Sequence, residues 1–106
     1  MKIVLFRDGH RGVAAKLPGE DPEVELSDLL GGETEMVPVT SKLCVVMLKN
    51  GKELELPPNY TAHRLGRTPL QVYGDCALIA LKIDGTYRDV DLVEVAAAEV
   101  YVRAVE

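Results

Sequence analysis

The chain has few of the residues on which metal binding and nucleophilic catalysis depend. Its 106 residues include two cysteines and two histidines. Neither histidine lies at a metal-ligand spacing from a cysteine or a carboxylate. We therefore expect no metal centre, no cofactor and no catalytic residue, and we predict that the protein is not an enzyme.

An excess of positive charge is missing as well. The 12 lysines and arginines are outnumbered by 17 aspartates and glutamates, which gives a formal net charge of −5. The phosphate backbone of a nucleic acid repels a protein with this field. A nucleic-acid partner is therefore not expected.

Long apolar runs are also absent. A membrane-spanning helix needs about 20 consecutive apolar residues, and no segment of the sequence approaches that length. The apolar run at Ile3–Phe6 is too short for the core of a signal peptide, which needs about 7–15 residues. We therefore expect a cytoplasmic protein without membrane contact, whose N-terminal run is a first strand.

The two cysteines, Cys44 and Cys76, each lie inside an apolar run. In a reducing compartment, isolated cysteines of this kind are typically free thiols that pack as small hydrophobic side chains. Pairing either thiol with a histidine for catalysis would require it to leave its apolar run. We predict that both thiols are buried and reduced.

What the sequence does contain is three Asx-Gly pairs, each of which follows an apolar run. Asn or Asp before Gly supplies the positive φ angles of a two-residue hairpin turn. The pattern predicts one α+β domain over residues 1–106, with a single antiparallel or mixed β-sheet built from hairpins and one or two short helices. About five to seven strands are expected in that sheet. The three pairs are Asp8-Gly9, Asn50-Gly51 and Asp84-Gly85.

The hairpin around Asn50-Gly51 is the most strongly patterned. Pairing residues 43–48 with residues 53–56 puts apolar side chains on one face and Glu53 and Glu55 on the other. A slip by one residue would bury both glutamates, so the register is well specified. We expect Gly51 to have a positive φ angle and this hairpin to form the stable centre of the fold.

Two segments carry helical signals. Ser27 as an N-cap and Gly31 as a stop predict a short helix that begins near Ser27, with an extended lead-in over residues 23–30 as the alternative. Over residues 91–106, helical spacing competes with strand alternation. We predict a short helix followed by a strand there.

The remaining segments are assigned from turn residues and alternation. Residues 3–7 and 10–17 are expected to pair as a first hairpin, and residues 59–70 to form a long loop with a helical turn at 60–65. The segment 18–22 is expected to be a loop, residues 34–39 an edge strand, 72–83 a strand broken at Gly74-Asp75, and 86–90 its hairpin partner.

Basic side chains concentrate in two of the expected loops, although the whole chain is acidic. If both loops lie at one end of the sheet, they form a positive pocket for a phosphate, a nucleotide-like anion or an acidic protein surface, with a tyrosine to stack a base. Solubilising charge scattered over loops is the alternative interpretation. The candidate ligand-binding residues are Arg7, His10, Arg11, Asn59, Tyr60, His63, Arg64 and Arg67.

Three stretches of the chain, taken in order, resemble a family of small domains of unknown function that is common in phages, plasmids and conjugative elements of gut bacteria. They are residues 29–38, 56–59 and 72–79, which read LLGGETEMVP, LPPN and VYGDCALI. In that family a Gly-Gly-aromatic-Ile-Glu stretch, a Pro-Asn step and a Gly-led apolar strand recur. Here Thr34 stands where the family usually has an aromatic residue. The family brings no catalytic residues.

The resemblance implies an accessory protein of a mobile genetic element. We therefore expect a non-enzymatic binding or interaction module that acts against a host defence protein. A protein that binds or sequesters a nucleotide-like anion is the alternative. The expected partners are a protein or an anionic small molecule, and the oligomeric state is open, a homodimer included.

Overall fold

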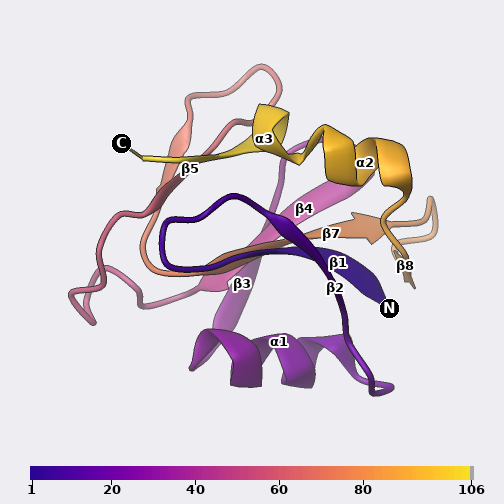
Figure 1. Cartoon of the computed structure of the whole chain (residues 1–106), viewed down its shortest axis with the longest axis horizontal. Helices are drawn as coiled ribbons and strands as arrows, with labels where there is room; N and C mark the ends of the chain where they lie inside the picture. Colours follow the sequence, from indigo (N-terminus) through magenta and orange to yellow (C-terminus); the bar gives the residue numbers. More distant parts are fainter. Residues whose placement is uncertain (106) are drawn as a thin grey trace.

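The computed structural model describes residues 1–105, so that Glu106, the last residue of the predicted domain, lies outside the described residues. The described chain forms nine strands and three short helices (Figure 1). Their bounds are β1 (Lys2–Phe6), β2 (Val13–Lys16), α1 (Pro22–Leu30), β3 (Thr34–Pro38), β4 (Leu43–Leu48), β5 (Tyr60–Ala62), β6 (Leu70–Val72), β7 (Cys76–Leu81), β8 (Tyr87–Arg88), α2 (Leu92–Ala96), α3 (Ala98–Tyr101) and β9 (Val102–Ala104). This confirms the predicted α+β class.

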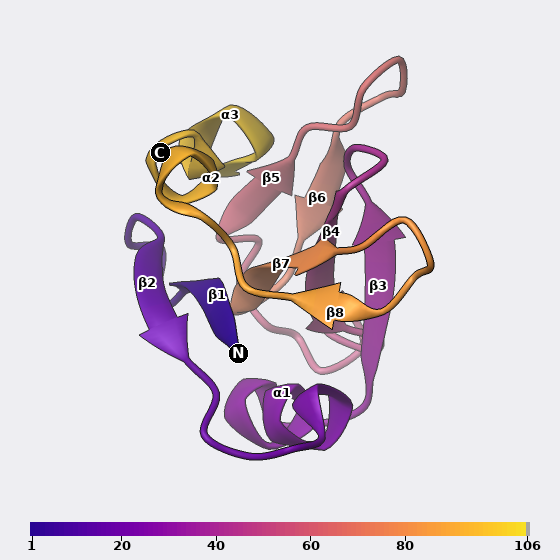
Figure 2. The same ribbon diagram turned by 90° about the vertical axis from the view of Figure 1, so that its right-hand side faces the viewer.

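The strands divide between two antiparallel sheets instead of the single sheet that the hairpins suggest. The larger sheet has the strand order β2-β1-β7-β4-β3, with β8 paired to β7, and the smaller sheet has the order β6-β5-β9. Helix α1 covers one face of the larger sheet, while the smaller sheet, α2 and α3 cover the other (Figures 1 and 2). The larger sheet is thus the middle layer of three.

The hairpin predicted around Asn50-Gly51 is wrong. Strand β4 pairs with β3 and β7, and residues 49–55 form turns. Because both faces of the sheet are covered, every residue of β4 is buried. A strand with six consecutive apolar residues is typical of this two-sided burial, whereas the hairpin required one of its faces to meet solvent.

The turn at Asp8-Gly9 does have positive φ angles at both residues, 53° and 77°. The His10 N–H donates a hydrogen bond to the Arg7 carbonyl oxygen at 2.8 Å across this turn. The strands, however, pair with Lys2 opposite Lys16, so that the segment between β1 and β2 holds one residue more than a two-residue turn requires. The first hairpin therefore forms, with a register shifted by one residue.

The third Asx-Gly pair also lies in a hairpin, between β7 and β8. The Lys82 N–H donates to the Thr86 carbonyl oxygen at 2.7 Å, which encloses three loop residues. Of the Asp84-Gly85 pair, Gly85 alone has a positive φ angle, 85°. The predicted hairpin is present with a longer loop.

Helix α1 begins at Pro22, well before the predicted start near Ser27. The carboxylate of Asp21 accepts the Val24 N–H and caps the helix, and proline suits its first turn because the N–H there has no partner within the helix. The predicted loop over residues 18–22 therefore ends at Asp21, and Pro22 is the first residue of α1. Gly31 ends the helix with a φ angle of 91°, as predicted.

The later segments combine confirmed and corrected predictions. Residues 60–62, predicted within a loop or helical turn, form the strand β5, whose Tyr60 and Ala62 are buried. The break at Gly74-Asp75 separates strands of different sheets, β6 and β7. The edge strand β3 and the order of helix followed by strand at the C-terminus are confirmed.

Replacement of Gly51 tests the packing of the turns that follow β4. Gly51 does not have the positive φ angle that we expected, but a Cβ atom there would lie 2.8 Å from the Tyr73 carbonyl oxygen. Because that oxygen belongs to the backbone, it cannot move away cheaply. We expect Gly51→Ala to lower the free energy of unfolding by about 1–3 kcal/mol, measured by urea denaturation.

The matched control is Asn50→Ala, in the same turn at an exposed residue. We expect it to change the free energy of unfolding by less than about 0.5 kcal/mol. A loss at Gly51 no larger than the loss at Asn50 would contradict the close approach to Tyr73.

The predicted burial of both cysteines is confirmed, and it makes a prediction about their reactivity. Cys44 and Cys76 are free thiols in the core, and burial raises the pKa of both. Because the thiolate is the reactive form, we expect a thiol reagent to label the folded protein slowly and the urea-unfolded protein at once. Prompt labelling of both thiols without denaturant would show that the core opens at β4 and β7.

Candidate functional site

The structure separates the predicted ligand-binding residues into two groups. Arg7, His10 and Arg11 lie in the loop between β1 and β2, next to the residues that start β5. His63, Arg64 and Arg67 follow the other end of β5, in the loop between β5 and β6. The two loops lie apart in both views (Figures 1 and 2), so the fold does not bring the groups together. Ligand binding by either group stays a prediction.

The first group surrounds a buried tyrosine. The Tyr60 hydroxyl donates to the His10 carbonyl oxygen at 2.7 Å, and its ring packs edge-on against Phe6 with 5.5 Å between centroids. Burial raises the pKa of Tyr60 to about 12. Because Tyr60 is fully buried, the expectation that it stacks a base is wrong.

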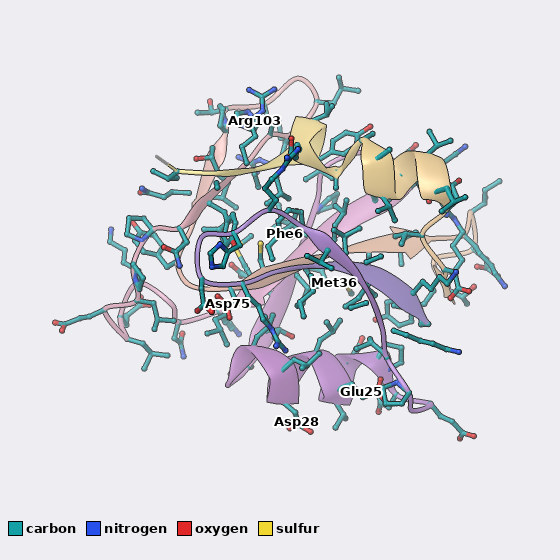
Figure 3. All side chains as sticks on the ribbon, in the orientation of Figure 1. Phe6, Glu25, Asp28, Met36, Asp75 and Arg103 are labelled. Atoms are coloured by element: carbon teal, nitrogen blue, oxygen red, sulfur yellow. The ribbon has the colours of Figure 1, made fainter. Side chains whose placement is uncertain are left out.

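Carboxylates neutralise much of the positive charge of the first group. Arg11 forms an ion pair with Glu99, and Asp75, which contacts the same loop, accepts the Asp8 N–H at 2.9 Å (Figure 3). An anion bound beside Arg7 would therefore lie close to negative charge. The electrostatics of the first group disfavour an anionic ligand.

The second group faces another part of the molecule. The Leu65 N–H donates to the Val39 carbonyl oxygen at 3.2 Å, which holds the loop between β5 and β6 beside the turn between β3 and β4 (Figure 2). Arg64 and Arg67 line a recess of about 260 Å³ with that turn. This part of the predicted set retains the geometry of a candidate site.

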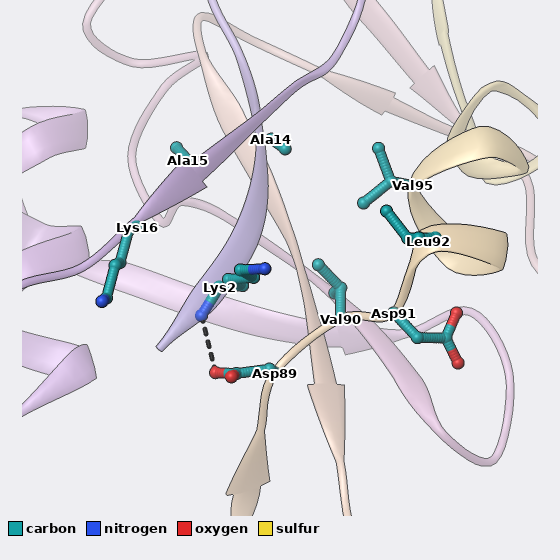
Figure 4. Close-up of a pocket in the computed structure, with 9 residues that line it drawn as sticks. All are labelled: Lys2, Ala14, Ala15, Lys16, Asp89, Val90, Asp91, Leu92 and Val95. Carbon is teal, nitrogen blue, oxygen red and sulfur yellow. Dashed lines mark hydrogen bonds between the residues drawn. The ribbon is translucent and has the colours of Figure 1, made fainter.

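A larger site, which the sequence analysis missed, lies between β2 and the start of α2 (Figure 4). We call it the β2 groove. It has a volume of about 540 Å³ and is open to solvent. The residues that line it are Lys2, Ala14, Ala15, Lys16, Asp89, Val90, Asp91, Leu92 and Val95. The small side chains on β2, which weaken its strand signal in the sequence, are what leave this space.

Strand β2 is an edge of the larger sheet, and part of its backbone points away from β1. The Leu17 N–H donates to the Met1 carbonyl oxygen at 2.8 Å, and the Met1 amino group donates to the Leu17 carbonyl oxygen at 3.0 Å. Hydrogen-bonded residues alternate along an antiparallel pair. Ala14 and Lys16 therefore direct their N–H and C=O groups outward, along the free edge.

The backbone of Lys2 supports this alternation. Its N–H donates to Asp89 Oδ1 at 2.8 Å, and its carbonyl oxygen accepts the Val90 N–H at 3.1 Å. Lys2 thus uses both backbone groups on the side away from β2, although it lies opposite Lys16 in the ladder. The outward N–H and C=O groups of Lys16 therefore belong to the free edge of β2.

The charged side chains that line the groove differ in whether other groups of the protein already engage them. The carboxylates of Asp89 and Asp91 accept backbone N–H groups at 2.8 and 2.7 Å, respectively. Within residues 1–105, neither Lys2 nor Lys16 forms an ion pair. Leu92, which forms an apolar wall of the groove, is accessible to solvent because it is 86% exposed. The groove therefore offers apolar surface beside two lysines that form no ion pair, and the formal charges of the two lysines and the two aspartates cancel.

Helix α2 is held in place by a capping box and an ion pair. Asp91 accepts the Glu94 N–H, and the Glu94 carboxylate accepts the Asp91 N–H in return. The two oxygens of Glu94 also accept two hydrogen bonds from the Arg88 guanidinium at 2.7 and 2.8 Å. This pair is largely shielded from solvent, so that it fixes the wall of the β2 groove relative to the sheet.

The replacement Glu94→Gln tests this support. Arg88 lowers the pKa of Glu94 in the folded protein, so the pair stabilises the fold above the unfolded pKa of Glu94 and stops doing so as the pH falls through its folded pKa. We expect Glu94→Gln to lower the free energy of unfolding by about 1–3 kcal/mol at neutral pH. Urea denaturation should show that this difference shrinks in acid.

The control is Glu20→Gln, which alters an exposed glutamate in the loop before α1. We expect it to leave the free energy of unfolding unchanged at both pH values. A Glu94→Gln protein that keeps the pH dependence of the parent would contradict the role of the ion pair.

The described residues form no helix that is long and apolar enough to cross a membrane. The same part of the chain brings no three histidines, cysteines or carboxylates together as a metal site. Comparisons with family models, with curated proteins and with solved structures each find no match for this chain. Its function is therefore inferred from its own residues.

Proposed function

We propose that this protein is a non-enzymatic interaction module that binds an extended segment of a partner protein along the free edge of β2. The observation that carries the proposal is the outward backbone of Ala14 and Lys16 beside the exposed Leu92. In strand addition, backbone hydrogen bonds supply affinity, and pockets for alternate side chains supply specificity. The β2 edge offers outward backbone groups for the first, and the groove beside Leu92 offers apolar surface for the second.

The charge of the groove defines the chemistry of the bound segment. Lys2 and Lys16 have no ion-pair partner within residues 1–105, while the two aspartates are engaged by backbone N–H groups. A segment with apolar side chains for the Leu92 wall and an acidic side chain for the lysines is complementary to this surface. The bound segment is therefore extended and apolar, with an acidic side chain placed against the lysines and away from Asp89 and Asp91.

A second copy of the chain suits the edge less well. Two β2 strands would bring only four residues from each copy together. The net charge of −5 on each copy makes the two copies repel each other.

The other edge of the larger sheet is protected. The Val39 N–H donates to the Leu43 carbonyl oxygen at 2.9 Å, so that alternation directs Thr34, Met36 and Pro38 outward from β3. Pro38 has no N–H to offer, and proline at an edge discourages strand addition. The β2 edge is therefore the better docking site in this sheet.

The biological setting of the proposal comes from the resemblance of three sequence stretches to domains of mobile genetic elements. An accessory protein of such an element gains from a small module that attaches to a host defence protein and blocks it. The β2 groove supports binding over acid–base catalysis, because its carboxylates hold the backbone of β1 and α2 in place.

Selection of random peptides displayed on phage tests the proposal. We expect enriched peptides with alternating apolar residues and an acidic residue. We also expect Ala14→Pro to abolish binding, because proline removes an outward N–H without removing a bond to β1. Leu92→Ser should weaken binding by about tenfold or more, since it removes an apolar anchor. Isothermal titration calorimetry with the selected peptides measures both effects.

Matched variants distinguish the groove from other surfaces. Met36→Pro alters the opposite edge, and Leu65→Ser alters a leucine that is 87% exposed elsewhere. Both should bind the peptides like the parent. Peptides that bind Ala14→Pro unchanged would contradict the proposal. A dimer in sedimentation that Ala14→Pro converts to a monomer would instead assign the edge to a second copy.

A further inference from the structure

Figure 2 shows the loop between β5 and β6 beside the turn between β3 and β4. Residues of this loop and this turn line a second recess, away from the β2 groove. We call it the arginine recess. Its volume is about 260 Å³, which is small for an organic ligand but sufficient for a hydrated oxyanion. The residues that line it are Pro38, Val39, Thr40, Ser41, Arg64, Leu65 and Arg67.

The two arginines are presented together by a tight turn. The Arg67 N–H donates to the Arg64 carbonyl oxygen at 3.3 Å, and Gly66 between them has a φ angle of 69°. The first and last residues of such a turn have Cα atoms within about 7 Å of each other. The fold thus holds two guanidinium groups at one side of the recess.

Arg64 is oriented but not saturated. Its Nη2 donates to the Thr68 carbonyl oxygen at 2.8 Å. Its Nε atom is shielded from solvent and has no hydrogen-bond partner among the described residues, 1–105. Within residues 1–105, neither Arg64 nor Arg67 forms an ion pair. The donors that remain for a ligand are therefore those of the Arg67 guanidinium and Nη1 of Arg64, whereas Nε of Arg64 lies too deep to reach one.

The opposite wall adds hydroxyl donors. Thr40 Oγ1 accepts the N–H groups of Lys42 at 3.1 Å and of Leu43 at 3.0 Å. A hydroxyl that already accepts keeps its own proton to donate. Ser41 is exposed beside it. No carboxylate of the described part of the chain lines the recess, in contrast to the loop between β1 and β2.

We infer that the arginine recess binds a tetrahedral oxyanion, namely a phosphate group, either free or at the end of a nucleotide. Arginine forks and hydroxyls are the donors that such a group prefers. The recess has no aromatic side chain in its lining, and Tyr60 is buried elsewhere. The recess therefore recognises the phosphate group and not a base.

Two-dimensional NMR of the amide groups, with titration of inorganic phosphate or AMP at constant ionic strength, tests the inference. We expect saturable shifts of the amides of Thr40 and Ser41 and of residues 64–67. Arg67→Gln should weaken phosphate binding by about tenfold, the value of one charge-assisted hydrogen bond. AMP should bind within about threefold of inorganic phosphate, because no aromatic ring adds a contact to the base.

The control is Arg7→Gln, which removes an exposed arginine from the other loop and should leave phosphate binding unchanged. The dispersion of the NMR spectrum shows that each variant is folded. Chemical shifts that do not saturate would overturn the site. An equal loss of phosphate affinity in Arg67→Gln and Arg7→Gln would overturn it as well. AMP that binds tenfold or more tightly than inorganic phosphate would overturn recognition of the phosphate group alone. These results are independent of peptide binding at the β2 groove.

Discussion

The pairing of β4 with β7 is the constraint on which the rest of the structure depends. Both strands lie inside the larger sheet, and all but one of their residues are buried. A sheet with apolar side chains on both faces must be covered twice. Helix α1 provides one cover, and the smaller sheet with α2 and α3 provides the other. Because both faces of the larger sheet are covered, its edges and loops are the surfaces that it offers for binding.

Local signals in the sequence were sufficient where the structure is local. The stop at Gly31, the turn at Asp8-Gly9 and the capped start of helix α2 at Asp91 all depend on residues within a few positions. The pairing of β4 depends on strands far away in the chain. An apolar run does not indicate whether one or both faces of the strand are covered. A hairpin at Asn50-Gly51 was therefore predicted for a strand that pairs with a distant one.

The candidate sites differ in how far the sequence could reveal them. Arg64 and Arg67 are close in the chain, and their selection did not require the fold. Their separation from Arg11, and the ion pair of Arg11 with Glu99, appear only in three dimensions. The β2 groove is assembled from three distant segments whose alanines, lysines and leucine carry no motif. Its recognition needed both the free edge and the position of α2.

The extra residue between β1 and β2 determines the phase of the exposed edge. With Lys2 opposite Lys16, the even-numbered residues of β2 present their backbone to solvent. A loop shorter by one residue would give these groups to β1 and expose those of Val13 and Ala15, while each side chain of the strand would move to the opposite face. A single insertion or deletion in this loop would thus change the surface offered to a partner without altering any residue of the strand.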